Sequence, residues 1–121
     1  MTPFKPKEVE KCWGHEIWLA NNKENDYCGK ILFIKEGEST SMHYHENKHE
    51  TFYVLSGKLK VETLKNDKRH RLHRDSVICI EGQSMEMPRD IPHKLFAHNG
   101  DLMLIEISTF HKDRDSYRME E

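Results

Sequence analysis

The chain is a succession of short β-type segments separated by turn residues, and this pattern constrains its fold more than any other feature. Segments rich in β-branched and aromatic residues recur about every 8–12 residues, with no helical crossover between them. Strands at this spacing are typical of antiparallel sandwiches and barrels, so we predict an all-β fold. The predicted strands cover residues 16–20, 27–35, 39–45, 51–55, 58–64, 69–72, 76–80, 84–87, 93–98 and 102–109.

The turns and the apolar pattern refine this prediction. Asn99-Gly100 is the strongest hairpin signal, because both residues tolerate the positive φ of a tight turn. Leu59 and Val61 alternate with charged residues and are predicted to point inward. Residues 102–107 are almost all apolar, which predicts a strand buried on both faces.

Length and composition exclude several classes of protein. At 121 residues the chain is predicted to form a single domain, 1–121, with its core at about 13–110 and a charged tail, 111–121, on the surface or frayed. Five Phe, four Tyr and two Trp are too many aromatic residues for a disordered chain. A net charge of −2 does not favour nucleic acid or an anionic membrane as partner. The apolar stretches are far shorter than the roughly 20 residues of a membrane helix, and the N-terminus lacks a signal-peptide core.

The cysteines favour a reducing compartment. There are three of them, an odd number without metal-type spacing, which argues against a disulfide scaffold. We therefore expect a cytoplasmic protein.

Histidine is over-represented, with nine residues, and one cluster carries most of the functional information. Residues two apart on a strand point the same way, so His43 and His45 are predicted to project from one face about 7 Å apart. Neutral imidazoles are ligands for divalent metals. Glu50 and the downstream His93 could complete the site. Such a His pair alone is more often a polar strand end than a metal site.

The spacing around this cluster resembles the first motif of the cupin superfamily. It runs Gly37, five residues, His43, one residue, His45, four residues, Glu50, six residues and Gly57.

A second motif of the same superfamily follows, with Gly82, five residues, Pro88, and then His93. This sequence departs from the family pattern at Asp90, where Gly is usual, and at Ala97, where Asn is common. Neither departure removes a ligand.

The resemblance implies a double-stranded β-helix, a jelly-roll-like antiparallel barrel that holds one divalent ion, Mn, Fe, Ni, Co or Zn. The ligands it implies are His43, His45, Glu50 and His93. His49 could replace Glu50, but on a strand it would point to the opposite face, so Glu50 is preferred. Three nitrogens and one oxygen leave two octahedral positions open for water or substrate.

The flanking sequences are similar to the cupin domain of type II mannose-6-phosphate isomerases. The matching stretches are Trp13-Gly14-His15-Glu16, Cys28-Gly29-Lys30, Ile105-Glu106-Ile107-Ser108 and the run from Asp113 to Arg118; Cys12 stands where that group has Pro. This resemblance implies interconversion of an aldose and a ketose, with a metal that polarises the carbonyl and the adjacent hydroxyl.

An isomerase needs a base, and a sugar phosphate needs a cation to hold it. Glu106 and Glu86 are candidate bases, and Lys30 and Arg89 are candidates for binding a phosphate or carboxylate. Each has a plainer interpretation as a surface or ion-paired residue. We assign no function to the remaining histidines, His15, His70, His73, His98 and His111.

Three functions remain open: a sugar or sugar-phosphate isomerase or epimerase, a non-catalytic cupin that binds a sugar or carboxylate, and an oxygenase that uses Fe or Mn. The expected partner is a small molecule, with neither nucleic acid nor membrane involved. A small barrel gains buried area by pairing, so we also predict a homodimer. Phe4, Val9 and Trp13 are predicted anchors on the partner.

Overall fold

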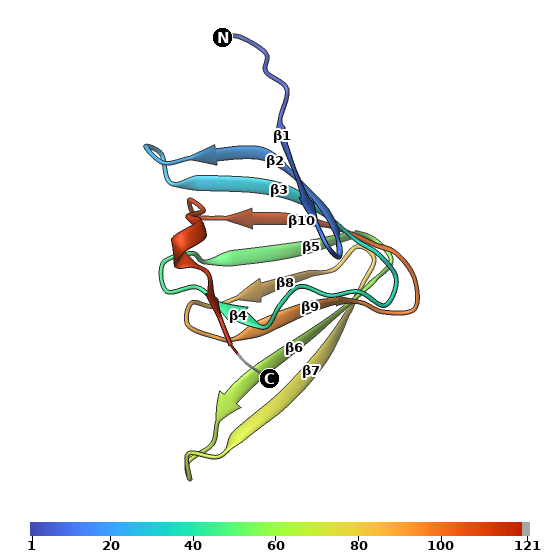
Figure 1. The fold of residues 1–121 in the computed structure, drawn as a ribbon, viewed down its shortest axis with the longest axis vertical. Coiled ribbons are helices and arrows are strands. Elements are labelled where there is room, and N and C mark those ends of the chain that lie inside the picture. The colour runs from blue at the N-terminus through green and yellow to red at the C-terminus, as the bar shows by residue number, and fades with distance from the viewer. Residues whose placement is uncertain (120–121) are drawn as a thin grey trace.

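Two antiparallel β-sheets packed face to face make up the computed structural model, which describes residues 1–119 (Figure 1). The all-β jelly-roll prediction is confirmed. The first sheet has the order β1 (Lys7–Lys11), β2 (Gly14–Asn22), β3 (Tyr27–Ile34), β10 (Leu102–Ser108), β5 (Glu50–Ser56), β8 (Ser84–Met87). The second has the order β11 (Tyr117–Arg118), β4 (His43–Tyr44), β9 (His93–Ala97), β6 (Lys58–Asn66), β7 (Leu72–Ile80).

The chain crosses between the sheets at several turns, and this corrects one prediction. Asn99-Gly100 does not close a hairpin, because β9 pairs with β4 and β6 while β10 pairs with β3 and β5. The turn still uses positive φ angles, 55° at Asn99 and 145° at Gly100. Gly57, at the β5–β6 crossing, has φ 88°, and a Cβ there would lie 2.2 Å from the main-chain oxygen of Asp101. Only glycine fits that close approach.

The core lies between the sheets and follows the predicted alternation in part. Leu59 and Val61 are buried, as expected. On β10, Leu102 and Leu104 face the core, but Ile107 is 59% exposed, so burial on both faces was wrong. The outer face of this antiparallel sheet is open to solvent. Only one face of β10 is therefore buried, whereas a strand in a parallel sheet is usually buried on both faces. Trp13 is buried in the core of its own chain.

Two strand predictions also differ from the structure. The predicted strand at 69–72 lies mostly in the turn of the β6–β7 hairpin, residues 67–71, and the predicted strand at 76–80 begins earlier, as β7 at Leu72. The strand β1 was not predicted; it pairs with β2 along five residues.

The charged tail folds back onto the second sheet. A 3₁₀ turn, η1 (Asp113–Asp115), leads into β11, which pairs with β4. The carboxyl-terminal part of the predicted tail, residues 120–121, lies outside the described residues. The cysteines at 12, 28 and 79 are unpaired, and no helix within residues 1–119 is long and apolar enough to span a bilayer.

Candidate metal centre

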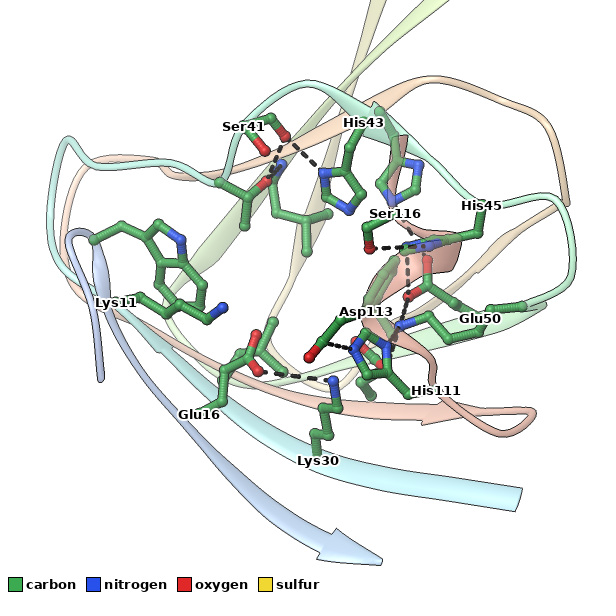
Figure 2. A pocket seen from close by; sticks show the side chains of 18 of the residues that line it. Lys11, Glu16, Lys30, Ser41, His43, His45, Glu50, His111, Asp113 and Ser116 are labelled. Atoms are coloured by element: carbon green, nitrogen blue, oxygen red, sulfur yellow. Dashed lines mark hydrogen bonds and ion pairs between the residues drawn. The ribbon is translucent and has the colours of Figure 1, made fainter. Parts of the chain in front are cut away.

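The three histidines of the two motifs meet between the sheets. His43 lies on β4 directly opposite His93 on β9, and His45 follows immediately after β4. One ring nitrogen from each lies within 4.8 Å of those of the other two. Figure 2 shows His43, His45 and Glu50 gathered on one side of the pocket.

Main-chain carbonyl groups orient all three imidazoles. The Nδ1 atoms of His43, His45 and His93 lie 2.8, 3.0 and 2.9 Å from the oxygens of Ser41, Asp115 and Ile91. Because a carbonyl oxygen can only accept, each Nδ1 carries the proton and each Nε2 presents a lone pair. This is the arrangement that metal-bound histidines use.

Three acceptor atoms in this group have no hydrogen-bond partner within residues 1–119. They are the buried Nε2 atoms of His45 and His93 and the Oε2 atom of Glu50. Glu50 Oε2 lies 3.3 Å from His93 Nε2, and Glu50 Oε1 lies 3.7 Å from His45 Nε2. Lone pairs that face one another in a buried site are costly unless a cation lies among them. The residues present therefore fit a divalent ion bound by three imidazoles and one carboxylate.

The protonation states also suit a cation. Burial, assisted by the neighbouring His93, lowers the pKa of His43 to about 3. Burial likewise lowers the pKa of His45, against the pull of the Glu50 charge. Burial acts to raise the pKa of Glu50, but the charge of Lys48, 3.0 Å away, acts in the opposite direction, and that pKa lies below its ordinary value. At neutral pH the site thus offers the neutral imidazoles of His43 and His45 and the ionised carboxylate of Glu50, as metal binding requires.

Lys48 connects the ligands to the rest of the pocket. Its ammonium group, 3% exposed, lies 3.0 Å from Glu50 Oε1, 3.2 Å from Glu106 Oε2 and 3.0 Å from His111 Nδ1. Burial alone would lower the pKa of Lys48, but the charges of Glu106 and Glu50 raise it well above its ordinary value. Because Lys48 holds Glu50 Oε1, it leaves Oε2 to face the histidines.

Two of the predicted catalytic residues lie in the same pocket. Glu106 on β10 is buried, and burial together with the Glu50 charge raises its pKa although Lys48 acts in the opposite direction. The hydrogen bonds that its carboxylate accepts from Lys48 and Ser108 both fall on Oε2. Lys30 on β3 is 2% exposed; its ammonium group is 3.7 Å from Glu16 and lies over the Trp18 ring.

The other two candidates lie outside the pocket. Arg89 is exposed and its Nε donates to the main-chain oxygen of Asn47 at 2.7 Å. Glu86 is exposed as well and pairs with His49 at 3.0 Å, so both side chains point away from the metal centre.

His111, for which no function was predicted, lines the pocket. Burial and the charges of Lys48 and Lys30 lower its pKa to about 4. Since its Nδ1 accepts from Lys48, its Nε2 carries the proton and donates to Asp113 at 2.9 Å. The one sequence signal near His111 was the run from Asp113 to Arg118, which is similar to the cupin domain of type II mannose-6-phosphate isomerases.

The pocket has a volume of about 710 Å³, within the range of small-molecule sites. Its floor is the metal centre, and its wall carries Lys48, Glu106 and His111. Trp13, Trp18, Lys30 and, from β1, Glu10 and Lys11 also line the pocket. Figure 2 shows Lys11 on the side of the pocket opposite His45 and Glu50. The pocket combines apolar rings with several ionisable groups.

Asp115 holds the ligand loop in place. Its carboxylate accepts from the backbone N–H groups of Glu46, Asn47 and Lys48 at 3.0, 3.1 and 3.0 Å, and its own carbonyl orients His45. The tail is therefore a support of the site.

Replacing Asp115 by Ala is expected to lower the free energy of unfolding by about 1–3 kcal/mol, because the buried N–H group of Lys48 and the partly buried N–H groups of Glu46 and Asn47 lose their acceptor. Metal affinity should fall about 10- to 100-fold, which is typical when a residue that positions a metal ligand is replaced. Urea denaturation and metal titration measure the two effects. The control is Asp113→Ala, which removes a side chain that is 91% exposed. Equal effects of the two substitutions would contradict this role.

The fold and the site together define a β-barrel of the cupin type with three histidines between its sheets that could hold a metal ion. The chain belongs to the cupin family, since the sequence profile of the Cupin domain matches residues 31–110. Among curated proteins, none matches this sequence.

Solved structures share the fold at low sequence identity. The capsular polysaccharide assembling protein CapF from Staphylococcus aureus is 16% identical with a TM-score of 0.80, covering 98% of this chain and 35% of that one. A single-substitution variant of oxalate decarboxylase from Bacillus subtilis is 18% identical with a TM-score of 0.75, and the match covers 94% of this chain and 30% of the decarboxylase. KdgF from Halomonas sp. is 17% identical with a TM-score of 0.70, and the match covers 89% of this chain and 91% of KdgF. This chain thus spans about a third of CapF and of the decarboxylase but most of KdgF.

Proposed function

We propose that this cupin is a divalent-metal-dependent isomerase or epimerase that acts on a sugar or sugar phosphate. The observation that carries the proposal is the convergence of the unpartnered Nε2 and Oε2 atoms at the floor of a pocket whose wall holds acid–base groups. The proposed ligands are His43, His45, Glu50 and His93. When bound, the ion would polarise a carbonyl and its neighbouring hydroxyl.

Glu106 is the proposed base. Its raised pKa brings it closer to the working pH of a proton-transferring group. Because Lys48 and Ser108 both bond to Oε2, the Oε1 atom is the one that would accept a proton from the carbon next to the carbonyl. Returning that proton to the former carbonyl carbon, with the hydroxyl proton moving to the other oxygen, completes the isomerisation without a co-reactant. Lys30 is the proposed donor to a hydroxyl or phosphate oxygen at the other side of the pocket.

The composition of the pocket favours catalysis over simple binding. A binding cupin would be expected to have an apolar, aromatic pocket without an acid–base group near the metal. Here Glu106, Lys48 and His111 stand beside the ligands. One structural neighbour is a capsular polysaccharide assembling protein, which agrees with a carbohydrate substrate. The unpaired cysteines support the further proposal of a cytoplasmic setting.

The test is an assay of the metal-loaded protein with a panel of aldoses, ketoses and their phosphates in D₂O, read by proton NMR. Isomerisation or solvent exchange of the proton next to the carbonyl is expected for at least one compound. Glu106→Gln should lower kcat by about 10²–10⁴-fold at unchanged metal content.

Glu86→Gln is the matched control, because Glu86 is 65% exposed and lies outside the pocket, and it should retain full activity. Oxygen uptake is followed in parallel. Metal-dependent oxygen consumption without isomerisation would point to the oxygenase alternative. Binding of a sugar without turnover or exchange would point to the non-catalytic one.

A further inference from the structure

Arg118 is a cation at the mouth of the metal pocket that the proposed function does not use. It lies on β11, is exposed, and lines the pocket. Its guanidinium group makes no salt bridge or hydrogen bond within residues 1–119. Because an arginine is always charged, the pocket has a permanent positive charge here that no described carboxylate neutralises.

The pairing of β11 with β4 fixes the direction of the Arg118 side chain. Arg118 lies directly opposite His43. Tyr117, the residue before it, lies opposite Tyr44, and the two tyrosine rings stack on one face of the sheet with their centroids 5.1 Å apart. Successive residues of a strand point to opposite faces, so Arg118 shares the other face with His43. That face is the one that lines the pocket.

The same cross-strand row contains two of the proposed metal ligands. On β4, His43 has Arg118 as its neighbour on one side and His93 as its neighbour on the other. The rings of the two histidines have centroids 4.7 Å apart. Directly opposite residues of an antiparallel pair have Cβ atoms about 4.5–5.5 Å apart. The guanidinium group of Arg118, at the end of a long side chain, is therefore within reach of a molecule that binds at the metal centre.

The main chain on both sides of Arg118 is held by hydrogen bonds. After it, the N–H group of Met119 donates to the main-chain oxygen of the buried Met42 at 2.9 Å. Before it, the carboxylate of Asp115 accepts from the loop that carries the ligands. An arginine on a fixed strand has only its side chain to order when a ligand binds, which lowers the entropic cost of binding.

The lysines that line the pocket are less suited to bind an anion at the metal centre. Lys48 is held by two buried carboxylates, and Lys30 is 3.7 Å from a glutamate on β2. Lys11 lies across the pocket from Glu50 (Figure 2). Among the described lysines and arginines of the pocket, Arg118 is therefore the one that has no carboxylate partner and lies next to a metal ligand.

We propose that Arg118 binds an anionic group of the substrate, a phosphate or a carboxylate, while other oxygens of the same molecule lie at the metal centre. This inference rests on the proposed function and specifies the charge of its substrate. A guanidinium group presents paired N–H donors that match two oxygens of a phosphate or carboxylate. The site thus prefers a sugar phosphate or a sugar acid to an uncharged sugar. Arg118 takes the role that was predicted for Arg89, and Lys30 binds a hydroxyl oxygen.

The test is calorimetric titration of the metal-loaded protein with glucose 6-phosphate, glucuronate and glucose, which differ from one another only in the group at one end of the sugar. The corresponding mannose and galactose series are measured in parallel. At least one anionic compound is expected to bind more tightly than its uncharged counterpart. Preference for the phosphate identifies a sugar phosphate as substrate, and preference for the carboxylate identifies a sugar acid.

Arg118→Gln should raise the dissociation constant of the preferred anion about 10- to 100-fold, because charged hydrogen bonds are lost. The dissociation constant of the uncharged sugar and the metal content should not change. Arg118→Lys should recover part of the affinity, since it keeps the charge but loses the paired donors. The matched control is Arg114→Gln: Arg114 is an exposed arginine of the same tail that does not line the pocket, and its replacement should leave the affinity unchanged.

Arg118→Gln protein with wild-type affinity for the anion would overturn the proposal. Equal weakening by Arg114→Gln, or the absence of any preference for an anionic compound in all three series, would do so too. Because binding is measured without turnover, the two proposals fail separately. Anion binding that depends on Arg118 without isomerisation of any sugar would overturn only the proposed isomerase, and isomerisation of uncharged sugars alone would overturn only the role of Arg118.

Discussion

Replacing Lys48 by Met is expected to lower the free energy of unfolding by about 3–5 kcal/mol, the cost of breaking a buried charge cluster by removing one partner. Lys48 is the ammonium group between Glu50 Oε1 and Glu106 Oε2, at 3.0 and 3.2 Å. Met fills a similar volume without charge, so packing changes little. Two buried carboxylates would then face each other without a cation.

Urea denaturation in the presence of a chelator measures this effect without a contribution from bound metal. The control is Lys60→Met, since Lys60 pairs with Glu62 at 3.7 Å but is 32% exposed. Exposed pairs contribute about 0–1 kcal/mol, and the control should therefore lose little. Adding Glu106→Gln to Lys48→Met should restore part of the lost stability, because one of the two unpaired charges is removed. Equal losses for Lys48→Met and Lys60→Met would contradict the role of Lys48.

The fold was predictable from local patterns in the chain. Alternation at Leu59 and Val61 and the turn residues between segments were enough to predict short antiparallel strands in a barrel or sandwich. The spacing from His43 to Glu50, together with His93, led to the group that the structure brings together. These predictions succeed because strand alternation and turn chemistry act over a few residues.

The residues around the ligands depend on contacts between distant segments, and single-sequence patterns do not contain them. His111 and Asp115 reach the site because the tail returns to β4, and Lys48 matters because β10 brings Glu106 beside it. Arg89 was a candidate for binding a phosphate or carboxylate, yet its side chain donates to the main-chain oxygen of Asn47. Ile107 was misjudged for the same reason, since only the sheet arrangement decides which face of β10 is covered.

The metal centre yields the second large expected effect, a loss of bound metal on replacing His93 by Ala. Wild-type protein should hold about one divalent ion per chain, measured by elemental analysis after loading with Mn, Fe, Co, Ni or Zn in turn. His93→Ala removes one nitrogen ligand and one of the unpartnered lone pairs, so the content should fall close to zero. In the wild type the ion should raise the free energy of unfolding by about 2.7 kcal/mol at a hundred times its dissociation constant.

His49→Ala is the matched control, because His49 adjoins the ligand Glu50 in sequence but its imidazole bonds to Glu86 on the outer surface. That variant should keep the metal and the stabilisation. The free energy of unfolding of the metal-free proteins distinguishes loss of a ligand from loss of stability. Without an ion, His93→Ala removes the unfavourable contact between His93 Nε2 and Glu50 Oε2 at 3.3 Å, and this gain offsets part of the packing energy that the substitution removes. The assignment of Glu50 rather than His49 would be wrong if His49→Ala lost the metal while Glu50→Gln retained it. A His93→Ala protein that binds and is stabilised by metal as the wild type is would show that the histidines serve packing alone.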